Sequence, residues 1–140
     1  MGRVMAIDYG RKRSGVAVTD RLQIIAGGLD TVPSAELPAY VKAYAEKEPI
    51  ERIIIGQPKQ MNNEASENAK YVEAFVNRLR KVLPGIPLQM YDERFTSVLA
   101  HRAMLEGGLK KKKRQEKALV DKVSAVIILQ SWLESKKTDQ

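Results

Sequence analysis

Two acidic residues stand just after apolar, strand-like segments of this chain. Asp8 ends the apolar run 4–7, and Glu93 lies two residues beyond the segment 87–91. The carboxyl ends of parallel strands meet at one edge of an open α/β sheet, and sites form outside that edge. An acid at a strand end is more often a turn former or a helix cap. Asp8 and Glu93 are therefore candidate site residues, and each is more convincing if the other lies close to it.

A third acid, Asp121, lies on the apolar side of a predicted helix. At 100° per residue its stripe also carries Ala125, Ile128 and Trp132. A carboxylate in that position is costly unless it is paired, hydrogen-bonded or bound to a metal ion. Two interpretations stay open, a salt bridge to a basic residue and convergence with the two acids above.

Three such carboxylates would make an all-oxygen cation site. The chain has no cysteine, and His101 is its single histidine, so thiolate and histidine-rich metal sites are excluded. Mg²⁺ or Mn²⁺ is the expected occupant. A pair of these ions activates water and stabilises the leaving oxygen in phosphodiester hydrolysis. The residue types favour a divalent-metal-dependent hydrolase whose catalytic residues and metal ligands are Asp8, Glu93 and Asp121.

Positive charge is concentrated in a few segments. The chain has 24 Lys and Arg residues against 17 Asp and Glu residues, a formal charge of +7. Clustered basic residues neutralise phosphates and release counterions, which suits a nucleic-acid partner. A solvated or lipid-facing basic surface stays open as the alternative, and the clusters gain weight only beside the three carboxylates. The candidate nucleic-acid-binding residues are Arg11, Lys12, Arg13, Arg94, Lys110, Lys111, Lys112, Lys113 and Arg114.

Composition and hydropathy indicate where the protein is located and how many domains it has. No apolar run approaches the roughly 18 residues that span a bilayer, and no apolar signal segment opens the chain. The lack of cysteine is consistent with a reducing cytosol. We therefore expect a cytoplasmic protein without membrane association, either a monomer or a homodimer. With no repeat, low-complexity stretch or linker, residues 1–140 are expected to form one domain.

The hydrophobic pattern predicts strands first and alternating strands and helices later. Short links between the first three strands predict an antiparallel meander, in which Gly10 and Gly15 frame a turn that would use positive φ. The later alternation predicts β-α-β crossovers and parallel pairing. The expected strands are 4–7, 15–19, 22–32 (interrupted at Gly27 and Gly28), 52–56 and 87–91; the expected helices are 33–47, 64–83, 96 or 97 to 106, and 117–135. The predicted fold is α/β, with a mixed five-stranded sheet flanked by helices.

Four motifs resemble those of the YqgF/RuvX family and follow one another in the family's order. They are AIDYGRKRSGVA at 6–17, IGQP at 55–58, DERFTS at 92–97 and VDKVSAVIILQ at 120–130. Members of this family are bacterial ribonuclease H-like proteins, described as Holliday junction resolvases and as nucleases that mature the precursor of small-subunit ribosomal RNA.

The resemblance implies a ribonuclease H-like nuclease domain with a catalytic acidic trio. In this chain the trio falls on Asp8, Glu93 and Asp121. The expected activity is hydrolysis of structured nucleic acid, as 5′-end maturation of pre-16S rRNA, Holliday junction resolution or both. The sequence does not choose between these substrates.

Two other functions compete with the nuclease. One is a non-catalytic nucleic-acid-binding module of the same fold that assists transcription or ribosome assembly; the intact carboxylates argue against it. The other is an actin-like ATPase, because Asp-x-Gly after a first strand also opens those proteins. They need two such domains around a nucleotide, and 140 residues supply one.

Overall fold

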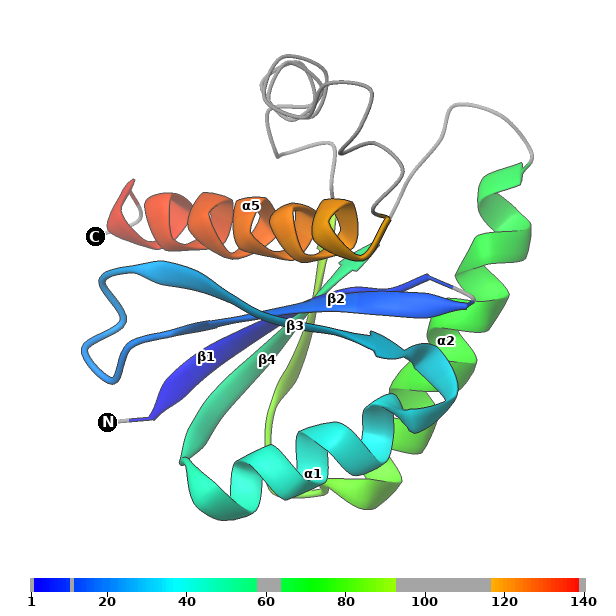
Figure 1. The fold of residues 1–140 in the computed structure, drawn as a ribbon, viewed down its shortest axis with the longest axis horizontal. Coiled ribbons are helices and arrows are strands. Elements are labelled where there is room, and N and C mark those ends of the chain that lie inside the picture. Colours follow the sequence, from blue (N-terminus) through cyan, green and yellow to red (C-terminus); the bar gives the residue numbers. More distant parts are fainter. Residues whose placement is uncertain (1, 11, 58–63, 93–116, 139–140) are drawn as a thin grey trace.

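The computed structural model describes residues 2–10, 12–57, 64–92 and 117–138, and it shows them as a sheet covered by helices on both faces (Figure 1). The elements in chain order are β1 (Arg3–Asp8), β2 (Arg13–Thr19), β3 (Ala26–Pro33), the 3-10 helix η1 (Ser34–Glu36), α1 (Leu37–Lys47), β4 (Ile50–Gln57), α2 (Glu64–Val82), β5 (Leu88–Asp92) and α5 (Lys117–Thr138).

The sheet has five strands in the order β3-β2-β1-β4-β5. β2 pairs antiparallel with both β1 and β3, whereas β4 runs parallel to β1 and β5 runs parallel to β4. This arrangement confirms the predicted mixed sheet. It also makes β1 the central strand, so the residue that ends β1 has a paired strand on each side.

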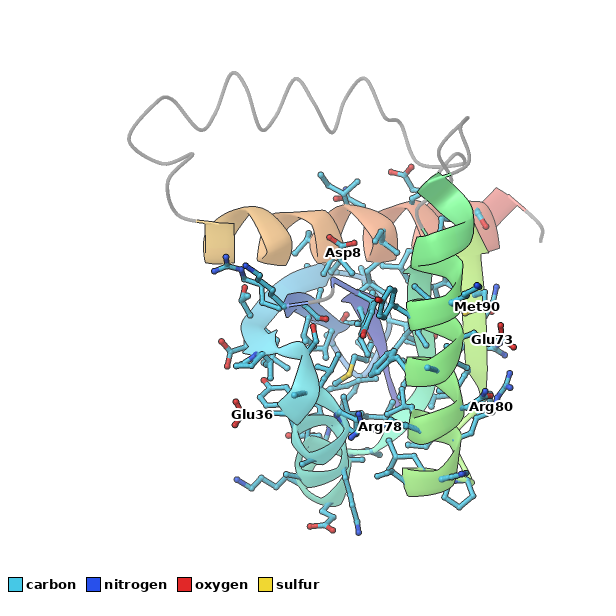
Figure 2. All side chains as sticks on the ribbon, turned by 90° about the vertical axis from the view of Figure 1, so that its right-hand side faces the viewer. Asp8, Glu36, Glu73, Arg78, Arg80 and Met90 are labelled. Atoms are coloured by element: carbon cyan, nitrogen blue, oxygen red, sulfur yellow. The ribbon has the colours of Figure 1, made fainter. Side chains whose placement is uncertain are left out.

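Strand alternation divides the core into two layers. Met5 and Ile7 of β1 belong to the cluster that packs against α1 and α2, and Val4 and Ala6 belong to the cluster that packs against α5. Figure 2 shows the side chains of α1 and α2 filling the first of these layers. Three members of the helix stripe predicted for α5 are confirmed as buried, namely Ala125, Ile128 and Trp132; the side chain of its fourth member, residue 121, lies outside the description.

The third strand differs from its prediction. It begins at Ala26 and not at Leu22, because the carboxylate of Asp20 accepts the backbone N–H groups of Ile24 (2.8 Å) and Ile25 (2.9 Å) and holds this stretch as a turn. Gly27 and Gly28 lie inside the strand. The irregularity is one residue later, where Val16 pairs with Asp30 but Ala17 pairs with Gly28, so that Leu29 is the extra residue of a β-bulge.

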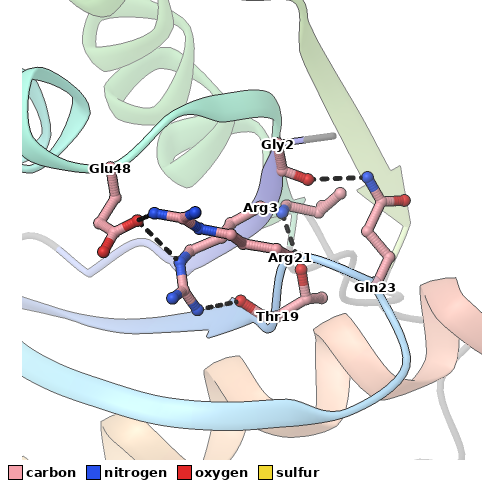
Figure 3. Close-up of polar contacts among 7 residues, drawn as sticks. Gly2, Arg3, Thr19, Arg21, Gln23 and Glu48 are labelled. Atoms are coloured by element: carbon pink, nitrogen blue, oxygen red, sulfur yellow. Dashed lines mark hydrogen bonds and ion pairs between the residues drawn. The ribbon is translucent and has the colours of Figure 1, made fainter.

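Charged residues at the amino end of β1 are paired with one another (Figure 3). Glu48, which precedes β4, accepts hydrogen bonds from Arg21 (3.0 Å) and Arg3 (3.5 Å). Arg3 also donates to the backbone oxygen of Thr19 at 2.9 Å. The hydrogen bond from Arg21 is the main reason that the pKa of Glu48 lies below its ordinary value. This end of the sheet is held by ion pairs.

One expected segment, the helix from 96 or 97 to 106, lies outside the described residues. Within the part of the chain that is described, no helix has the length and apolar character needed to cross a bilayer.

Candidate active site at the carboxyl end of the central strand

Asp8 lies on the α5 side of the sheet. It ends β1 and is separated by two and four residues from Ala6 and Val4, whose side chains pack in the cluster beneath α5. Because side chains alternate along a strand, Asp8 projects to the same face (Figure 2). Its side chain is half-buried. It follows Val4 and Ala6, the buried residues on the same face of the strand.

Glycines flank Asp8 on both neighbouring strands. In register, Asp8 pairs with Gly15 of β2 and with Gly56 of β4. Paired residues in adjacent strands present their side chains to the same face about 5 Å apart, so neither neighbour adds a side chain beside the carboxylate. Both glycines are buried. The carboxylate of Asp8 therefore lies between two neighbouring strand positions that have no side chain.

The expected reason for glycine in this hairpin was wrong. None of the glycines that the structure describes has a positive φ, and these include Gly10 and Gly15. At Gly10 the constraint is space, because a Cβ atom there would lie 2.5 Å from the backbone oxygen of Arg13. The turn after Asp8 is too tight for any side chain at this position.

Tyr9 anchors the chain on the opposite face from Asp8. Its ring stacks on Phe75 of α2, with centroids 4.7 Å apart and planes inclined by 22°. It packs against the cluster beneath α1 and α2. In this structure Tyr9 is therefore a packing residue of the layer beneath α1 and α2.

Two buried serine hydroxyls hold the turn between β1 and β2. The Gly10 N–H donates to Ser14 Oγ at 3.2 Å, the Ser14 and Ser34 hydroxyls lie 2.8 Å apart, and Ser34 Oγ donates to the Gly10 carbonyl. From the sequence, Ser34 was recognised only as part of the predicted helix 33–47. The signal that could have found its second role is strand pairing, since β3 runs beside β2 and brings Pro33 opposite Arg13.

A sequence model of the RuvX family, described as Holliday junction resolvase, matches residues 2–135. The chain belongs to the RuvX family. This confirms the predicted family, and with it the class of enzyme: the chain is a nuclease of a family that acts on nucleic acid.

Close relatives of this RuvX chain are bacterial. A protein of Parabacteroides distasonis named "Putative pre-16S rRNA nuclease" is 66% identical over 137 residues, which cover 98% of each chain. A protein of the same name from Phocaeicola vulgatus is 67% identical over 137 residues, covering 98% of this chain and 99% of the relative.

Solved structures agree with the predicted ribonuclease H-like fold. The RuvC protein of Thermus thermophilus in complex with a Holliday junction aligns with a TM-score of 0.60 at 17% identity, covering 98% of this chain and 96% of that one. A second RuvC structure from Thermus thermophilus gives a TM-score of 0.57 at 14% identity, covering 97% of this chain and 96% of that one. At these identities the likeness concerns the fold.

The other two acids of the predicted trio are described less fully than Asp8. Residue 121 lies in the first turns of α5, but its side chain is not described, and Glu93 lies outside the described residues. The C-terminal half of α5 lies at the β2–β3 turn, where Leu133 and Glu134 line a hollow with Ile25. The first turns of α5 therefore lie toward the other end of the sheet, as Figure 1 shows. Within the described part, no three His, Asp or Glu side chains come together to hold a metal ion.

Of the predicted nucleic-acid-binding residues, two are described. Lys12 and Arg13 are exposed, at the junction of the turn and β2. They lie on the chain between Asp8 and the serine pair. Arg11, Arg94 and residues 110–114 lie outside the described part of the chain.

Proposed function

We propose that this RuvX chain hydrolyses phosphodiester bonds in structured nucleic acid, with Asp8, Glu93 and Asp121 as its catalytic metal ligands. The observation that carries the proposal is the position of Asp8. It ends the central strand of a mixed sheet, faces α5 and has glycine in register on both sides. A half-buried carboxylate whose register partners on both neighbouring strands are glycines is suited to bind a cation and the phosphate that the cation carries.

Helix periodicity supports a role for Asp121. Residue 121 precedes Ala125 by one turn of α5, and Ala125 is fully buried against the same face of the sheet that carries Asp8. Residues four apart lie on the same side of a helix. We therefore infer that residue 121 lies on the sheet-facing side of α5, in the first turns of the helix, toward the carboxyl end of β1.

Strand alternation supports a role for Glu93. Tyr91 of β5 is buried in the cluster beneath α5 and pairs in register with Gly56, which itself pairs with Asp8. Glu93 follows Tyr91 by two residues, and an extended chain would return its side chain to the same face. All three acids are then proposed to lie on one side of the sheet.

The donor set fits a divalent cation. A carboxylate on a strand end, with two further carboxylates proposed beside it, offers hard oxygen ligands of the kind that Mg²⁺ and Mn²⁺ bind. When bound, such ions supply a nucleophile from water and stabilise charge on the leaving oxygen. The chain's own contribution is to orient the three carboxylates and, through Lys12 and Arg13, to neutralise the phosphates on either side of the cleaved bond.

The proposed substrates are the 5′ region of pre-16S rRNA and branched DNA. The names of the bacterial relatives favour the first, and the description of the family favours the second. We place this activity in the cytoplasm, in a single nuclease domain of residues 1–140 that acts as a monomer or a homodimer.

The test compares cleavage of a precursor rRNA fragment and a four-way DNA junction by wild type and Asp8→Asn, each with Mg²⁺ and with Mn²⁺. We expect metal-dependent product from the wild type, a loss of activity on the order of 10³-fold in Asp8→Asn, and nucleic-acid binding retained in the variant. Equal cleavage by both proteins would remove Asp8 from the mechanism. Binding by the wild type without cleavage under any metal condition would favour the non-catalytic module instead.

A further inference from the structure

The hydrogen bonds around Gly10 form a closed ring with defined proton positions. Ser34 has one hydroxyl hydrogen, and it points to the Gly10 carbonyl, which can only accept. Ser14 must therefore be the donor in its 2.8 Å hydrogen bond with Ser34. Ser14 in turn accepts the Gly10 N–H at 3.2 Å. The ring starts and ends at one residue, so both backbone polar groups of Gly10 are bound.

The ring is buried and is reinforced by a neighbouring backbone hydrogen bond. Ser14 is fully buried and Ser34 is 5% exposed. The Ser34 N–H also donates to the Lys12 carbonyl at 3.0 Å. Ser34, at the end of the β3 hairpin, thus binds the turn at two points, on either side of residue 11. In a buried setting each of these polar groups needs its partner, because water cannot replace it.

The turn that this ring holds joins the two functional parts of the site. Asp8 lies two residues before Gly10, and the exposed Lys12 and Arg13 lie two and three residues after it. Exposed lysine and arginine side chains are long and flexible, so their reach over the site depends on where their backbone is fixed. The ring fixes that backbone with neutral groups, which add no net charge to the site.

We propose that Ser14 and Ser34 are positioning residues of the nuclease: their hydroxyl ring sets the placement of Lys12 and Arg13 relative to Asp8, and thereby the placement of the substrate phosphates. This inference rests on the proposed function. It assigns Ser34, which lies outside the family motifs at 6–17, 55–58, 92–97 and 120–130, a part in the reaction through the turn that it holds.

The experiment compares Ser34→Ala, Ser14→Ala, the double variant and Ser34→Thr with a matched control, Thr19→Val. Thr19 is 1% exposed, and its hydroxyl accepts the Val4 N–H at 2.9 Å at the opposite end of the sheet. The control therefore also removes a buried hydroxyl that binds backbone. Cleavage and binding are measured well below the melting temperature of every variant, and rates are corrected for the folded fraction.

We expect kcat of Ser34→Ala to fall by about ten- to a hundredfold, the range that a displacement of about 1 Å near the reacting groups produces. Ser14→Ala should behave in the same way, and the double variant should be little worse than either single one, because opening the ring at one place already releases Gly10. Ser34→Thr keeps the hydroxyl and should restore activity. Thr19→Val should lower the melting temperature without lowering kcat.

Salt dependence gives a readout that does not need cleavage. If Lys12 or Arg13 loses its phosphate contact, the slope of log K against log salt concentration becomes shallower by about one unit for duplex DNA. Ser34→Ala should show this change and Thr19→Val should not.

Two outcomes of these experiments separate a failure of the proposed function from a failure of the positioning role. A wild type that binds but never cleaves contradicts the proposed function, and the positioning role then stands or falls on the salt slope. A wild type that cleaves, with Ser34→Ala matching Thr19→Val in both kcat and salt slope, overturns the positioning role and leaves the proposed function intact.

Discussion

The two ends of the central strand are held in different ways. At the amino end, Arg3 and Arg21 bind one carboxylate, that of Glu48. At the carboxyl end, neutral hydroxyls of Ser14 and Ser34 bind the backbone of the turn, and the basic side chains beside it face outward. One end uses charged groups to hold the fold, whereas the turn at the other end is held by neutral hydroxyls and carries exposed basic residues.

This contrast separates stability from function along a single strand. Ion pairs at a surface contribute little individually and weaken in salt, which is tolerable where no ligand binds. At a site that binds a polyanion, a basic side chain that forms an ion pair within the fold would have to break that pair to bind the substrate. Neutral hydrogen bonds remove that conflict. The comparison predicts that changes at the carboxyl end affect activity first, and that changes at the amino end affect the free energy of unfolding first.

The largest effect outside the Asp8 and serine variants is expected from Gly56→Ala, with Gly27→Ala as its control. Both glycines lie in strands, and a Cβ atom at Gly27 would have only the Val18 carbonyl nearby, at 3.9 Å. A methyl group at position 56 would project beside Asp8, so we expect kcat to fall by about tenfold or more. Gly27→Ala should keep wild-type activity.

The melting temperature without metal distinguishes two explanations of Gly56. If glycine is needed only so that α5 can pack closely, Gly56→Ala will melt well below Gly27→Ala even in the absence of cations. If the space serves the cation and phosphate, the two variants will melt alike, and only Gly56→Ala will lose activity and the stabilisation by metal.

The stabilisation by bound metal should depend on the carboxyl end of β1 and not on its amino end. Crowded carboxylates repel one another when no cation is present, so Mg²⁺ at about 100 times its Kd should stabilise the wild type by about 2.7 kcal/mol. Asp8→Asn should lose this increase in melting temperature. Glu48→Gln, which makes the same change in net charge at the opposite end, should retain it; loss of the increase in both variants would mean that the ion acts through overall charge.

The smallest effect is expected from Glu48→Gln in the absence of metal. The pKa of Glu48 is lowered, first by its hydrogen bond from Arg21, so its charged form stabilises the fold above the ordinary glutamate value of 4.5. That contribution is lost as the pH falls below 4.5 through the lowered pKa in the folded state. Glu48→Gln should therefore melt slightly below wild type at pH 7, and the difference should shrink in acid. Cleavage should be unchanged; a fall in kcat would contradict the division between the two ends.

Periodic patterns in the sequence predicted the layers of this fold. The alternation in β1 and the stripe through Ala125, Ile128 and Trp132 depend on burial alone, and burial repeats with a period that a sequence displays. The start of β3 was missed because Leu22, Ile24 and Ile25 look like strand residues. In the structure they are 67%, 57% and 68% exposed, since a single carboxylate at Asp20 satisfies the backbone as a turn.

The site was predictable where it depends on residue type and less so where it depends on contacts. Asp8 was identified from its place at the end of an apolar run. Its two glycine neighbours could be recognised only from strand register, and the partnership of Ser14 and Ser34 joins residues 20 apart in sequence. Hydroxyls are common in loops, so residue type gave no sign of a ring that closes through tertiary structure. Glu93 and the basic run 110–114 remain predictions from motif and composition.

The stacked rings of Tyr9 and Phe75 connect α2, which packs on one face of the sheet, to the strand end that carries Asp8, the proposed metal ligand on the other face. One peptide bond separates the aspartate on the upper side of the sheet from an aromatic ring anchored in the lower layer. We therefore expect a substitution that removes the Phe75 ring to loosen Tyr9 and, through the adjoining backbone, the position of Asp8. Such a change would reach the proposed metal ligand from the far side of the sheet.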